Sequence, residues 1–358
     1  MRIRMLIIGC ALALVAAACG SEAPTVERNF GVLDHGDQGA LQKLAYNYQP
    51  DSTLRYGFAM DTRMHTDMDF PGLGGSGDMS MGMSMGGNLQ YDVASGPQPG
   101  STALTMRSDV SSFDLDHLTV DGQSMASELS AADLAALGDQ SAIPEITVVV
   151  DELGGILELR SGDTALPTEL FEGLGAGGFS DPTGMSLAGM FGPEMPADQV
   201  RVGAEWTVDN SQDIPFLGPL ASSTHYWITG QEQYQGHDVL VIVSASTIDE
   251  VEIDLADMMA SMLTMDSNAL GEMGMSADDL AMMQSGLFAD INMTMRFNYN
   301  DLKTTTYFDP SQGIVRWTST QSLMTGSMEM DTPDGSGSMT FDMEMGLQMM
   351  LADDGLGA

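Results

Sequence analysis

Apolar and polar side chains alternate over long stretches of this chain. Between residues 54 and 70 the even positions are mostly apolar and the odd positions are mostly polar or charged. The alternation resumes from Met79 to Val93, after a glycine-rich segment at residues 71–77. A period of two residues is typical of a β-strand with one buried face and one wet face. The two stretches therefore predict a hairpin whose buried face consists largely of methionine.

The C-terminal part repeats this design with a different sequence. A strand from about residue 313 to residue 330 is predicted to turn at 332–337 and to return over residues 339–349. Further strands are predicted at 146–150, 156–159, 200–208, 225–228, 239–243, 291–299 and 304–308. About a dozen strands joined by short turns predict a mainly β protein with a large curved antiparallel sheet or half-barrel.

Two long segments break the alternating pattern. Residues 164–199 are rich in Gly, Pro and Met, whereas residues 249–290 contain neither Lys nor Arg. In the second segment Leu255, Met258 and Met262 lie at helical spacing. Segments of this length between strands usually cover a functional surface or are poorly ordered. We therefore expect a few short helices in lid-like insertions: a Gly/Pro/Met-rich loop over 164–199 and an acidic, Met-rich helical insertion over 249–290.

The chain begins like an exported protein. Arg2 and Arg4 precede an apolar run over residues 5–18, which is too short to cross a membrane as a stable helix. The run ends in Val15-Ala16-Ala17-Ala18-Cys19-Gly20, which resembles the lipobox of bacterial lipoproteins. That resemblance implies a diacylglycerol thioether on Cys19 and hence a membrane anchor. The alternative is ordinary secretion, with cleavage near Ala18 by the general signal peptidase.

These features divide the chain into four predicted parts. They are a lipoprotein signal peptide (1–18), the lipidated Cys19 with a tether and N-terminal segment (19–50), an antiparallel β-rich domain (51–350) and a flexible tail (351–358). Cys10 lies in the signal peptide, so the mature chain keeps one cysteine and forms no internal disulfide. The sequence indicates neither which membrane leaflet holds the anchor nor the oligomeric state.

The charge of the chain narrows its partners. Fifty-one acidic residues against 12 Lys and Arg give a formal net charge of −39. Such a field repels nucleic acid and anionic lipid headgroups. Attachment to a membrane must therefore come from the acyl chains of the anchor. We expect no nucleic-acid partner.

Motifs for catalysis fail in their structural context. Gly82-Met83-Ser84-Met85-Gly86 fits a nucleophile elbow, but Ser84 lies within a predicted strand rather than between a strand and a helix. The segments 72–77 and 173–178 match a dinucleotide fingerprint without the strand and helix that it requires. The five histidines are scattered and form no zinc-ligand pair. The sequence therefore predicts no enzyme activity, no cofactor and no specific metal site.

Methionine is the conspicuous residue type, with 32 in the whole chain. Three roles are open: core packing, an apolar wall that accommodates a ligand, and Cu(I) binding through soft thioethers. The methionines alternate in step with Leu89, Tyr91 and Phe341, which favours a core or a cavity wall. The side chains predicted to line a ligand site are Met60, Met64, Met79, Met81, Met83, Met85, Met293, Met295, Met339, Met343 and Met345.

Three short motifs resemble known proteins. Val202-Gly203-Ala204-Glu205-Trp206, Tyr234-Gln235-Gly236 and the segment from Tyr307 to Val315 are similar to uncharacterised actinobacterial-type secreted lipoproteins. The general plan over residues 200–330 also resembles the LolA and LppX/LprG lipoprotein carriers, which implies a curved antiparallel sheet around a cavity for acyl chains.

The function expected from these observations is a non-enzymatic, membrane-anchored envelope lipoprotein. Its Met-rich concave sheet face would hold or carry a lipid or other hydrophobic ligand. The alternatives are a Met-rich lipoprotein that binds or buffers Cu(I), and a structural or adhesive protein of the cell surface.

Overall fold

A single antiparallel sheet accounts for the regular structure in the part of this protein that the structure describes. The computed structural model describes residues 33–70, 75–124, 145–161, 164–166, 192–214, 218–254, 292–332 and 335–352. Within these ranges every helix or strand assigned is a β-strand, and all fifteen strands belong to one sheet. The prediction of a mainly β protein with one large antiparallel sheet is therefore confirmed.

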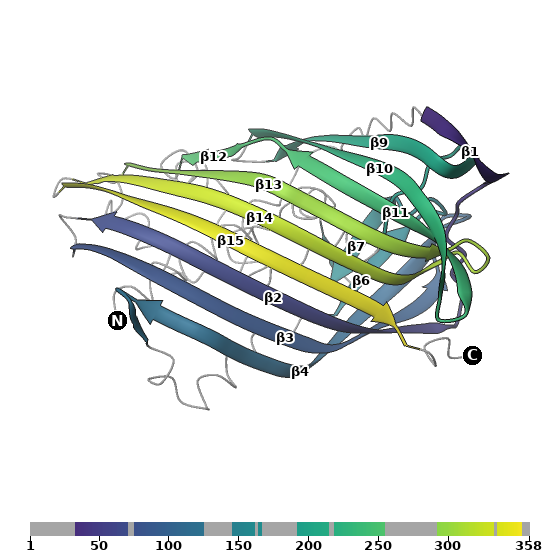
Figure 1. Ribbon diagram of the computed structural model, residues 1–358, viewed down its shortest axis with the longest axis horizontal. Helices are drawn as coiled ribbons and strands as arrows, with labels where there is room; N and C mark the ends of the chain where they lie inside the picture. The colour runs from purple at the N-terminus through teal and green to yellow at the C-terminus, as the bar shows by residue number, and fades with distance from the viewer. Residues whose placement is uncertain are drawn as a thin grey trace.

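The strands are numbered in chain order. They are β1 (Leu33–Gln42), β2 (Thr53–Phe70), β3 (Gly75–Ser95), β4 (Thr102–Val120), β5 (Gln123–Ser124), β6 (Ile146–Val150), β7 (Ile156–Ser161), β8 (Thr164–Leu166), β9 (Val200–Ile214), β10 (Gly218–Tyr234), β11 (His237–Ile248), β12 (Val251–Asp254), β13 (Asn292–Asp309), β14 (Ile314–Thr332) and β15 (Gly335–Leu351). Thirteen of them follow one another in the order β1-β9-β10-β11-β13-β14-β15-β2-β3-β4-β6-β7-β8. The short strands β5 and β12 pair with β4 and β13. Figure 1 shows the long strands running along the longest axis of the molecule.

Two long hairpins form the centre of the sheet. Strands β2 and β3 pair from Thr53 opposite Asp92 to Phe70 opposite Gly75, which is the hairpin predicted from the alternation. Strands β14 and β15 form the predicted C-terminal hairpin. The two hairpins are joined because β15 pairs with β2, with Met343 directly opposite Met64. Segments that are almost 280 residues apart in the sequence thus become neighbours.

One end of the sheet is drawn together by a segment that joins two distant turns. The backbone N–H of Tyr46 donates to the carbonyl of Glu152 in the β6–β7 turn, at 2.8 Å. The N–H of Asn47 donates to the carbonyl of Gly313 in the β13–β14 turn, at 3.0 Å. Four strands separate β14 from β6 in the sheet order, so the sheet must curl to bring both turns to one segment.

A second segment, residues 192–199, links the β6–β7 turn to strand β9 on the other side of the sheet. The N–H of Met195 donates to the carbonyl of Leu153 at 2.7 Å, and the hydroxyl of Tyr46 donates to the carbonyl of Pro193 at 2.8 Å. The indole N–H of Trp206 on β9 donates to the carbonyl of Glu194 at 2.9 Å. We call this part of the sheet the closed end, and the part near the β2–β3 and β14–β15 turns the open end.

Two apolar clusters of the core lie at the closed end, and a small one of Met293, Met328 and Met330 lies at the open end. Leu44, Tyr46 and Met195 are buried against Trp206 and Phe308. A second apolar cluster fills the space between β2, β3, β4, β6, β7 and β15. We call the face of the sheet that packs against these groups the inner face, and the opposite face the outer face. The inner face is the concave one, because the sheet curls around the segments that pack on it.

Strand β4 is missing from the sequence prediction because two β-bulges shift its alternation. Gly87 pairs with Val110 and Gly86 with Ser112, which leaves Ser111 as an extra residue. A second shift follows between the pairs Met83–Leu115 and Gly82–His117. Each extra residue moves the side chains that follow it to the other phase of the period-two pattern. A bulge at Asn300 likewise divides β13, which the alternation predicted as two separate strands.

Three boundaries also differ from the prediction. The sheet begins with β1, which pairs with β9, so the β-rich part starts before residue 51. Residues 251–254 were predicted to belong to a helical insertion, but their apolar–acidic alternation forms β12 against β13. Residues 164–166 were predicted as loop and form β8 against β7. Residues 192–199 were predicted as part of the same lid-like loop, but they pack at the closed end. Residues 167–191 and 255–290 of the predicted insertions lie outside the described residues.

Candidate functional site

The register of the sheet places the predicted methionines on one face. Residues directly opposite each other in an antiparallel pair point to the same side of the sheet. All eleven predicted ligand-site methionines are connected by such pairings and lie on the inner face. They are Met60 and Met64 on β2, Met79, Met81, Met83 and Met85 on β3, Met293 and Met295 on β13, and Met339, Met343 and Met345 on β15. What they bind stays a prediction.

Two rows of methionine cross the sheet at right angles to the strands. The first consists of Met81, Met64, Met343 and Met324, on β3, β2, β15 and β14. The second consists of Met68, Met339, Met328 and Met295, on β2, β15, β14 and β13. Directly opposite residues have Cβ atoms about 4.5–5.5 Å apart, so each row is a continuous band of thioether side chains. We call these bands the methionine rows.

Burial of the methionines on the inner face is uneven, because Met293, Met328 and Met330 form a buried cluster at the open end, with exposed fractions of 5%, 5% and 7%. Met60 and Met85, next to the core cluster, are 2% and 4% exposed. Met64, Met81 and Met343 lie four residues further along their strands, toward the open end, and are half-buried. The inner face between this cluster and the closed end is therefore an apolar surface that is only partly buried.

Away from the β13–β14 turn, charged side chains on the long strands β2, β3, β4, β13, β14 and β15 lie on the outer face. On β2 the outward odd positions hold all the charged residues, namely Arg55, Asp61, Arg63, Asp67 and Asp69, together with His65. The inward positions of β2, β3, β14 and β15 that pair with the methionines hold apolar, glycine or hydroxyl residues. The same separation holds for β4 and β13 once their bulges are taken into account. Away from that turn, the inner face of these strands is free of charge.

Hydroxyl side chains form a second sector of the inner face, which the sequence analysis did not identify. It consists of Thr224, Ser244, Ser246, Thr304, Thr306, Thr318 and Thr320, on β10, β11, β13 and β14. We call it the hydroxyl sector. Thr304 pairs with Thr320 at 3.0 Å between their Oγ1 atoms, and Thr306 with Thr318 at 3.3 Å. Thr and Ser alternate with residues of similar polarity on these strands, so no contrast marks the inward positions.

One buried hydroxyl on the methionine side has no hydrogen-bond partner within the described part of the chain. Thr62 lies on β2 between Met83 and Met345 in the register, and its side chain is 4% exposed. Among the described residues, its Oγ1 makes no hydrogen bond. A buried hydroxyl without a partner costs about 1–3 kcal/mol, so this position calls for a group that can accept or donate a hydrogen bond.

Tyrosine hydroxyls on the inner face are protected from ionisation. Burial raises the pKa of Tyr299, which lies opposite Met324. Burial also raises the pKa of Tyr226, next to the hydroxyl sector, and the negative charge of Glu194 adds to that rise. Both hydroxyls therefore stay neutral through the physiological range, which keeps this face uncharged.

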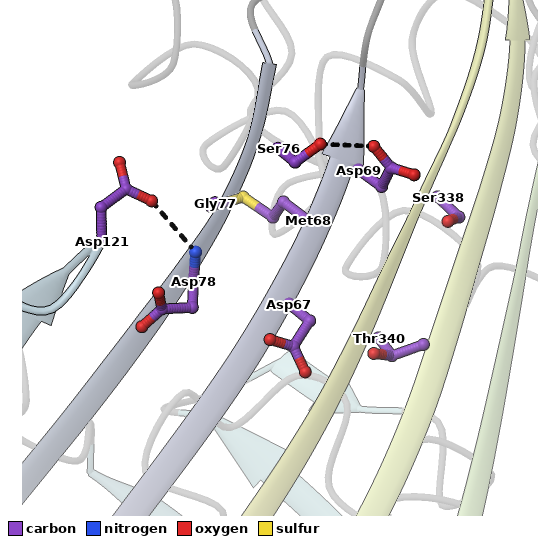
Figure 2. Close-up of a pocket in the computed structure, with 9 residues that line it drawn as sticks. All are labelled: Asp67, Met68, Asp69, Ser76, Gly77, Asp78, Asp121, Ser338 and Thr340. Carbon is purple, nitrogen blue, oxygen red and sulfur yellow. Dashed lines mark hydrogen bonds between the residues drawn. The ribbon is translucent and has the colours of Figure 1, made fainter.

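An acidic pocket lies on the outer face at the open end (Figure 2). It has a volume of about 450 Å³, and its lining includes Asp67, Asp69, Asp78 and Asp121. Ser76 donates to a carboxylate oxygen of Asp69 at 2.6 Å, and the N–H of Asp78 donates to Asp121 at 3.2 Å. Among the described residues, no group of three or more His, Cys, Asp or Glu side chains is arranged to hold a metal ion.

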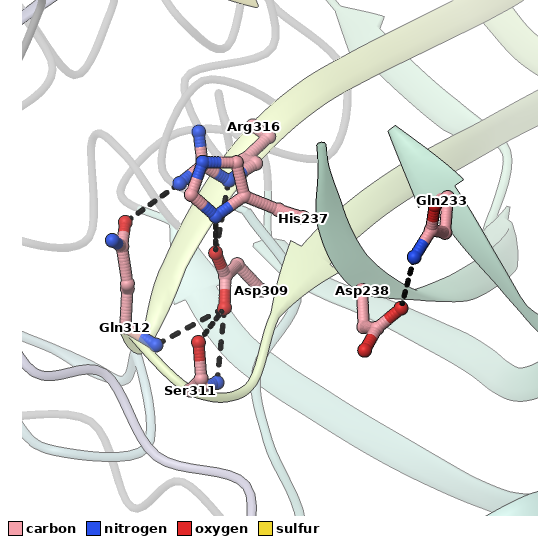
Figure 3. A network of polar contacts seen from close by, with 7 residues as sticks. All are labelled: Gln233, His237, Asp238, Asp309, Ser311, Gln312 and Arg316. Carbon is pink, nitrogen blue, oxygen red and sulfur yellow. Dashed lines mark hydrogen bonds and ion pairs between the residues drawn. The ribbon is translucent and has the colours of Figure 1, made fainter. Parts of the chain in front are cut away.

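A buried ion pair stabilises the β13–β14 turn (Figure 3). Asp309 is fully buried, and it accepts hydrogen bonds from the guanidinium of Arg316 at 2.9 Å and from the hydroxyl of Ser311 at 2.6 Å. Nδ1 of His237 lies 3.2 Å from the same carboxylate. Burial alone would raise the pKa of Asp309, but the hydrogen bonds from Ser311 and Arg316 outweigh it and hold that pKa below its usual value. These charges fix a turn at the closed end, away from the methionine rows.

Other predicted features fall outside the described residues. Cys19 and the signal peptide are among them, as are the helical stripes predicted within 255–290. Within the described part, no helix has the length and apolar character needed to span a membrane.

The fold and its inner face together define a class of protein: one large open antiparallel sheet with a methionine-rich concave side, which in the described strands carries no charge beyond the closed end. No family model and no curated protein matches the chain. The predicted relationships to actinobacterial-type lipoproteins and to the LolA and LppX/LprG carriers therefore stay predictions.

Three solved structures match the chain at low similarity. The chain is similar to lipovitellin, whose structure describes its lipid–protein interactions, with 11% identity and a TM-score of 0.36 over 87% of this chain and 26% of lipovitellin. It is also similar to an outer membrane channel from Pseudomonas putida F1, at 7% identity and a TM-score of 0.18 over 89% of this chain and 100% of that one. The outer membrane protease OmpT from Escherichia coli matches at 7% identity and a TM-score of 0.15, over 88% of this chain and 99% of that one.

Proposed function

We propose that this protein is a membrane-anchored envelope lipoprotein, and that the inner face of its sheet binds a lipid or other hydrophobic molecule without catalysing a reaction. The observation that carries the proposal is the half-buried state of six of the eight methionines in the methionine rows, on strands without inward charge; they are Met64, Met68, Met81, Met295, Met339 and Met343. An apolar surface of this kind is stabilised when an apolar ligand replaces water on it, by about 25 cal/mol per Å² removed from water.

The residue type supports a ligand more than a fixed packing partner. Methionine has three rotatable bonds and a polarizable sulfur, so a surface made of it can adapt to chains of different length and saturation. A core that only needed to be filled would use side chains with fewer rotamers, such as Leu, Ile and Val. At the closed end, Leu104 and Val148 fill the core together with fully buried methionines such as Met106, so this reasoning applies to the half-buried methionines of the rows.

The proposed anchor explains how such a protein would meet its ligand. A lipidated Cys19 would be followed by 13 residues before β1 begins at Leu33, which is a tether between the membrane and the sheet. The net charge of −39 disfavours adsorption to an anionic membrane surface. The acyl chains would therefore hold the protein near a membrane without pressing the sheet onto it.

Extraction of the purified full chain with organic solvent tests the proposal. The expected result is a non-covalent apolar molecule in the extract, in near-stoichiometric amount by mass spectrometry, since the thioether-linked lipid on Cys19 resists extraction. Met64→Asp places a carboxylate in the first methionine row, and an unpaired charge in an apolar site should reduce bound ligand by about 100-fold. His65→Asp introduces the same residue at the adjacent, outward position and should leave binding unchanged.

Two further results decide the matter. Met64→Leu keeps the site apolar and should retain the ligand, which separates loss of binding from loss of folding. If the extract of the wild-type chain contains no apolar ligand beyond that found with Met64→Asp, the proposal is wrong.

Copper binding is the second candidate function, favoured by the adjacency of four thioethers in the first methionine row. Thioether sulfur selects Cu(I) among the common metal ions. Substitution of Met64, Met81, Met324 and Met343 by Leu preserves an apolar surface but removes every sulfur of that row. Anaerobic Cu(I) titration against a competing chelator should then show a loss of affinity if the row binds copper. Equal affinity before and after the substitutions would exclude this function for the row.

A further inference from the structure

The inner face is divided into two chemically different sectors that touch. Thr320 of the hydroxyl sector lies directly opposite Leu347, which lies opposite Met60. In the next row Ser322 lies opposite Met345, which lies opposite Thr62. A molecule on the inner face would therefore meet methionine and other apolar side chains over β15, β2 and β3, and hydroxyls over β11, β13 and β14.

The paired hydroxyls keep hydrogen-bonding capacity for a further partner. In the Thr304–Thr320 pair one hydroxyl donates to the other, at 3.0 Å, and the accepting residue still has its own O–H to donate. The same holds for the Thr224–Ser246 pair, at 2.9 Å. Each pair thus offers one proton and several lone pairs to a ligand. An ester carbonyl of a ligand can accept a hydrogen bond from such a pair, and a ligand hydroxyl can both donate to it and accept from it.

Thr62 provides an independent indication. Its hydroxyl is buried within the methionine side of the face and makes no hydrogen bond among the described residues. A buried hydroxyl of this kind destabilises the folded protein unless a ligand oxygen or hydroxyl forms a hydrogen bond with it. Thr62 therefore indicates that the ligand carries a polar atom even where it lies among apolar side chains.

The absence of charge on this face limits what that polar atom can be. The described inward positions of β2, β3, β4, β11, β13, β14 and β15 beyond the closed end hold no Lys, Arg, Asp or Glu. A carboxylate or phosphate bound here would be removed from water without a counter-charge, which is unfavourable by several kcal/mol in an apolar environment. The net charge of −39 adds a repulsion for every anion.

We propose that the ligand is an uncharged lipid with ester or hydroxyl oxygens. Its chains lie along the methionine rows, and its oxygens contact Thr62 and the hydroxyl sector. This inference rests on the proposed function and specifies its ligand class: a neutral acylated lipid is bound, and a fatty acid or an anionic phospholipid with the same chains is not.

Photo-crosslinking compares the two classes directly. The full chain, purified in detergent and returned to phosphatidylcholine vesicles, receives either diacylglycerol or phosphatidic acid with identical diazirine-labelled acyl chains. After illumination, peptide mass spectrometry locates and quantifies the adducts. The expected result is labelling of peptides from β2, β3 and β15, with diacylglycerol labelling them at least about tenfold more than phosphatidic acid.

Two double variants test the role of the hydroxyl sector. Thr304→Val with Thr320→Val removes both members of one pair, which leaves neither hydroxyl stranded and should be nearly neutral for stability. It should reduce diacylglycerol labelling by about three- to tenfold. Thr305→Val with Ser319→Ala changes the opposed pair on the same two strands that faces outward, and should leave labelling unchanged.

The outcomes separate this inference from the function it rests on. Equal labelling of the inner face by both lipids, or labelling that the Thr304/Thr320 substitutions do not change, overturns the ligand class while hydrophobic binding stands. Absence of inner-face labelling with either lipid overturns both. Diacylglycerol labelling that exceeds phosphatidic acid labelling and falls in the inner-face double variant supports the inference.

Discussion

Replacement of Thr62 by valine should make this protein more stable. The two side chains have nearly the same volume and similar strand propensity, so the substitution mainly removes the hydroxyl. That hydroxyl is 4% exposed and unpaired among the described residues. Relief of an unpaired buried hydroxyl is worth about 1–3 kcal/mol, and we expect a gain of about 1–2 kcal/mol in the free energy of unfolding.

Thr306→Val serves as a control, because the same substitution there should lower the free energy of unfolding. Thr306 lies on the same inner face and is equally buried, but its hydroxyl is paired with that of Thr318 at 3.3 Å. Its replacement leaves the Thr318 hydroxyl buried without a partner. We therefore expect a loss of about 1–2 kcal/mol from the same chemical change.

Urea denaturation of the delipidated chain measures both effects. With a slope of about 3 kcal/mol per M, the midpoint should rise by about 0.3–0.7 M for Thr62→Val and fall by a similar amount for Thr306→Val. A midpoint for Thr62→Val that is equal to or below the wild-type value would refute the reasoning, because it would mean that the hydroxyl has a partner in the ligand-free protein. In lipid-loaded protein the gain in unfolding free energy from Thr62→Val should be smaller, because the ligand then forms a hydrogen bond with the Thr62 hydroxyl.

Three further expectations follow from the same structure. Hydrogen peroxide should oxidise Met350, which is 48% exposed, before the half-buried Met64 and Met343, and these before Met106 at 0% exposure; peptide mass spectrometry over time gives the order. Asp309→Asn should cost about 3 kcal/mol at pH 7, because Arg316 loses its buried partner. The pKa of Asp309 is depressed in the folded state, so its contribution is complete above the unfolded value of about 4 and is lost as the pH falls through the folded value; the difference in urea midpoint between wild type and variant should therefore narrow below pH 4. Gly326→Ala should destabilise by about 1–3 kcal/mol in the same assay, because the Phe341 ring occupies the place of the added methyl group, whereas Gly57→Ala, with open space at that position, should not show this steric penalty.

The individual long hairpins were predictable because their pattern is local. Alternation over residues 54–70 and 339–349 reports which side of a strand is buried without any knowledge of the partner strand. Strand β4 was not predictable in this way. Its inward residues Val110, Phe113, Leu115, Leu118 and Val120 follow spacings of three and two, because the bulges at Ser111 and Asp116 are accommodated by pairing with β3.

The hydroxyl sector shows a different limit. Thr304 and Thr306 on β13 are separated by the outward Thr305, so the residue type gives no contrast between inward and outward positions there. Pairing with Ser244 on one side and Thr320 on the other selects the inward set. A property shared by four strands cannot be read from any one of them.

The sequence by itself determined that this chain forms strands with a methionine-rich side, since side-chain alternation is a property of consecutive residues. It also set the charge, which follows from composition alone. The tertiary structure decided that the two hairpins join through β15 and β2, which turns separate methionine faces into continuous rows. It also decided which threonines share that face, because contacts between distant strands depend on the closure of the whole sheet rather than on local preference.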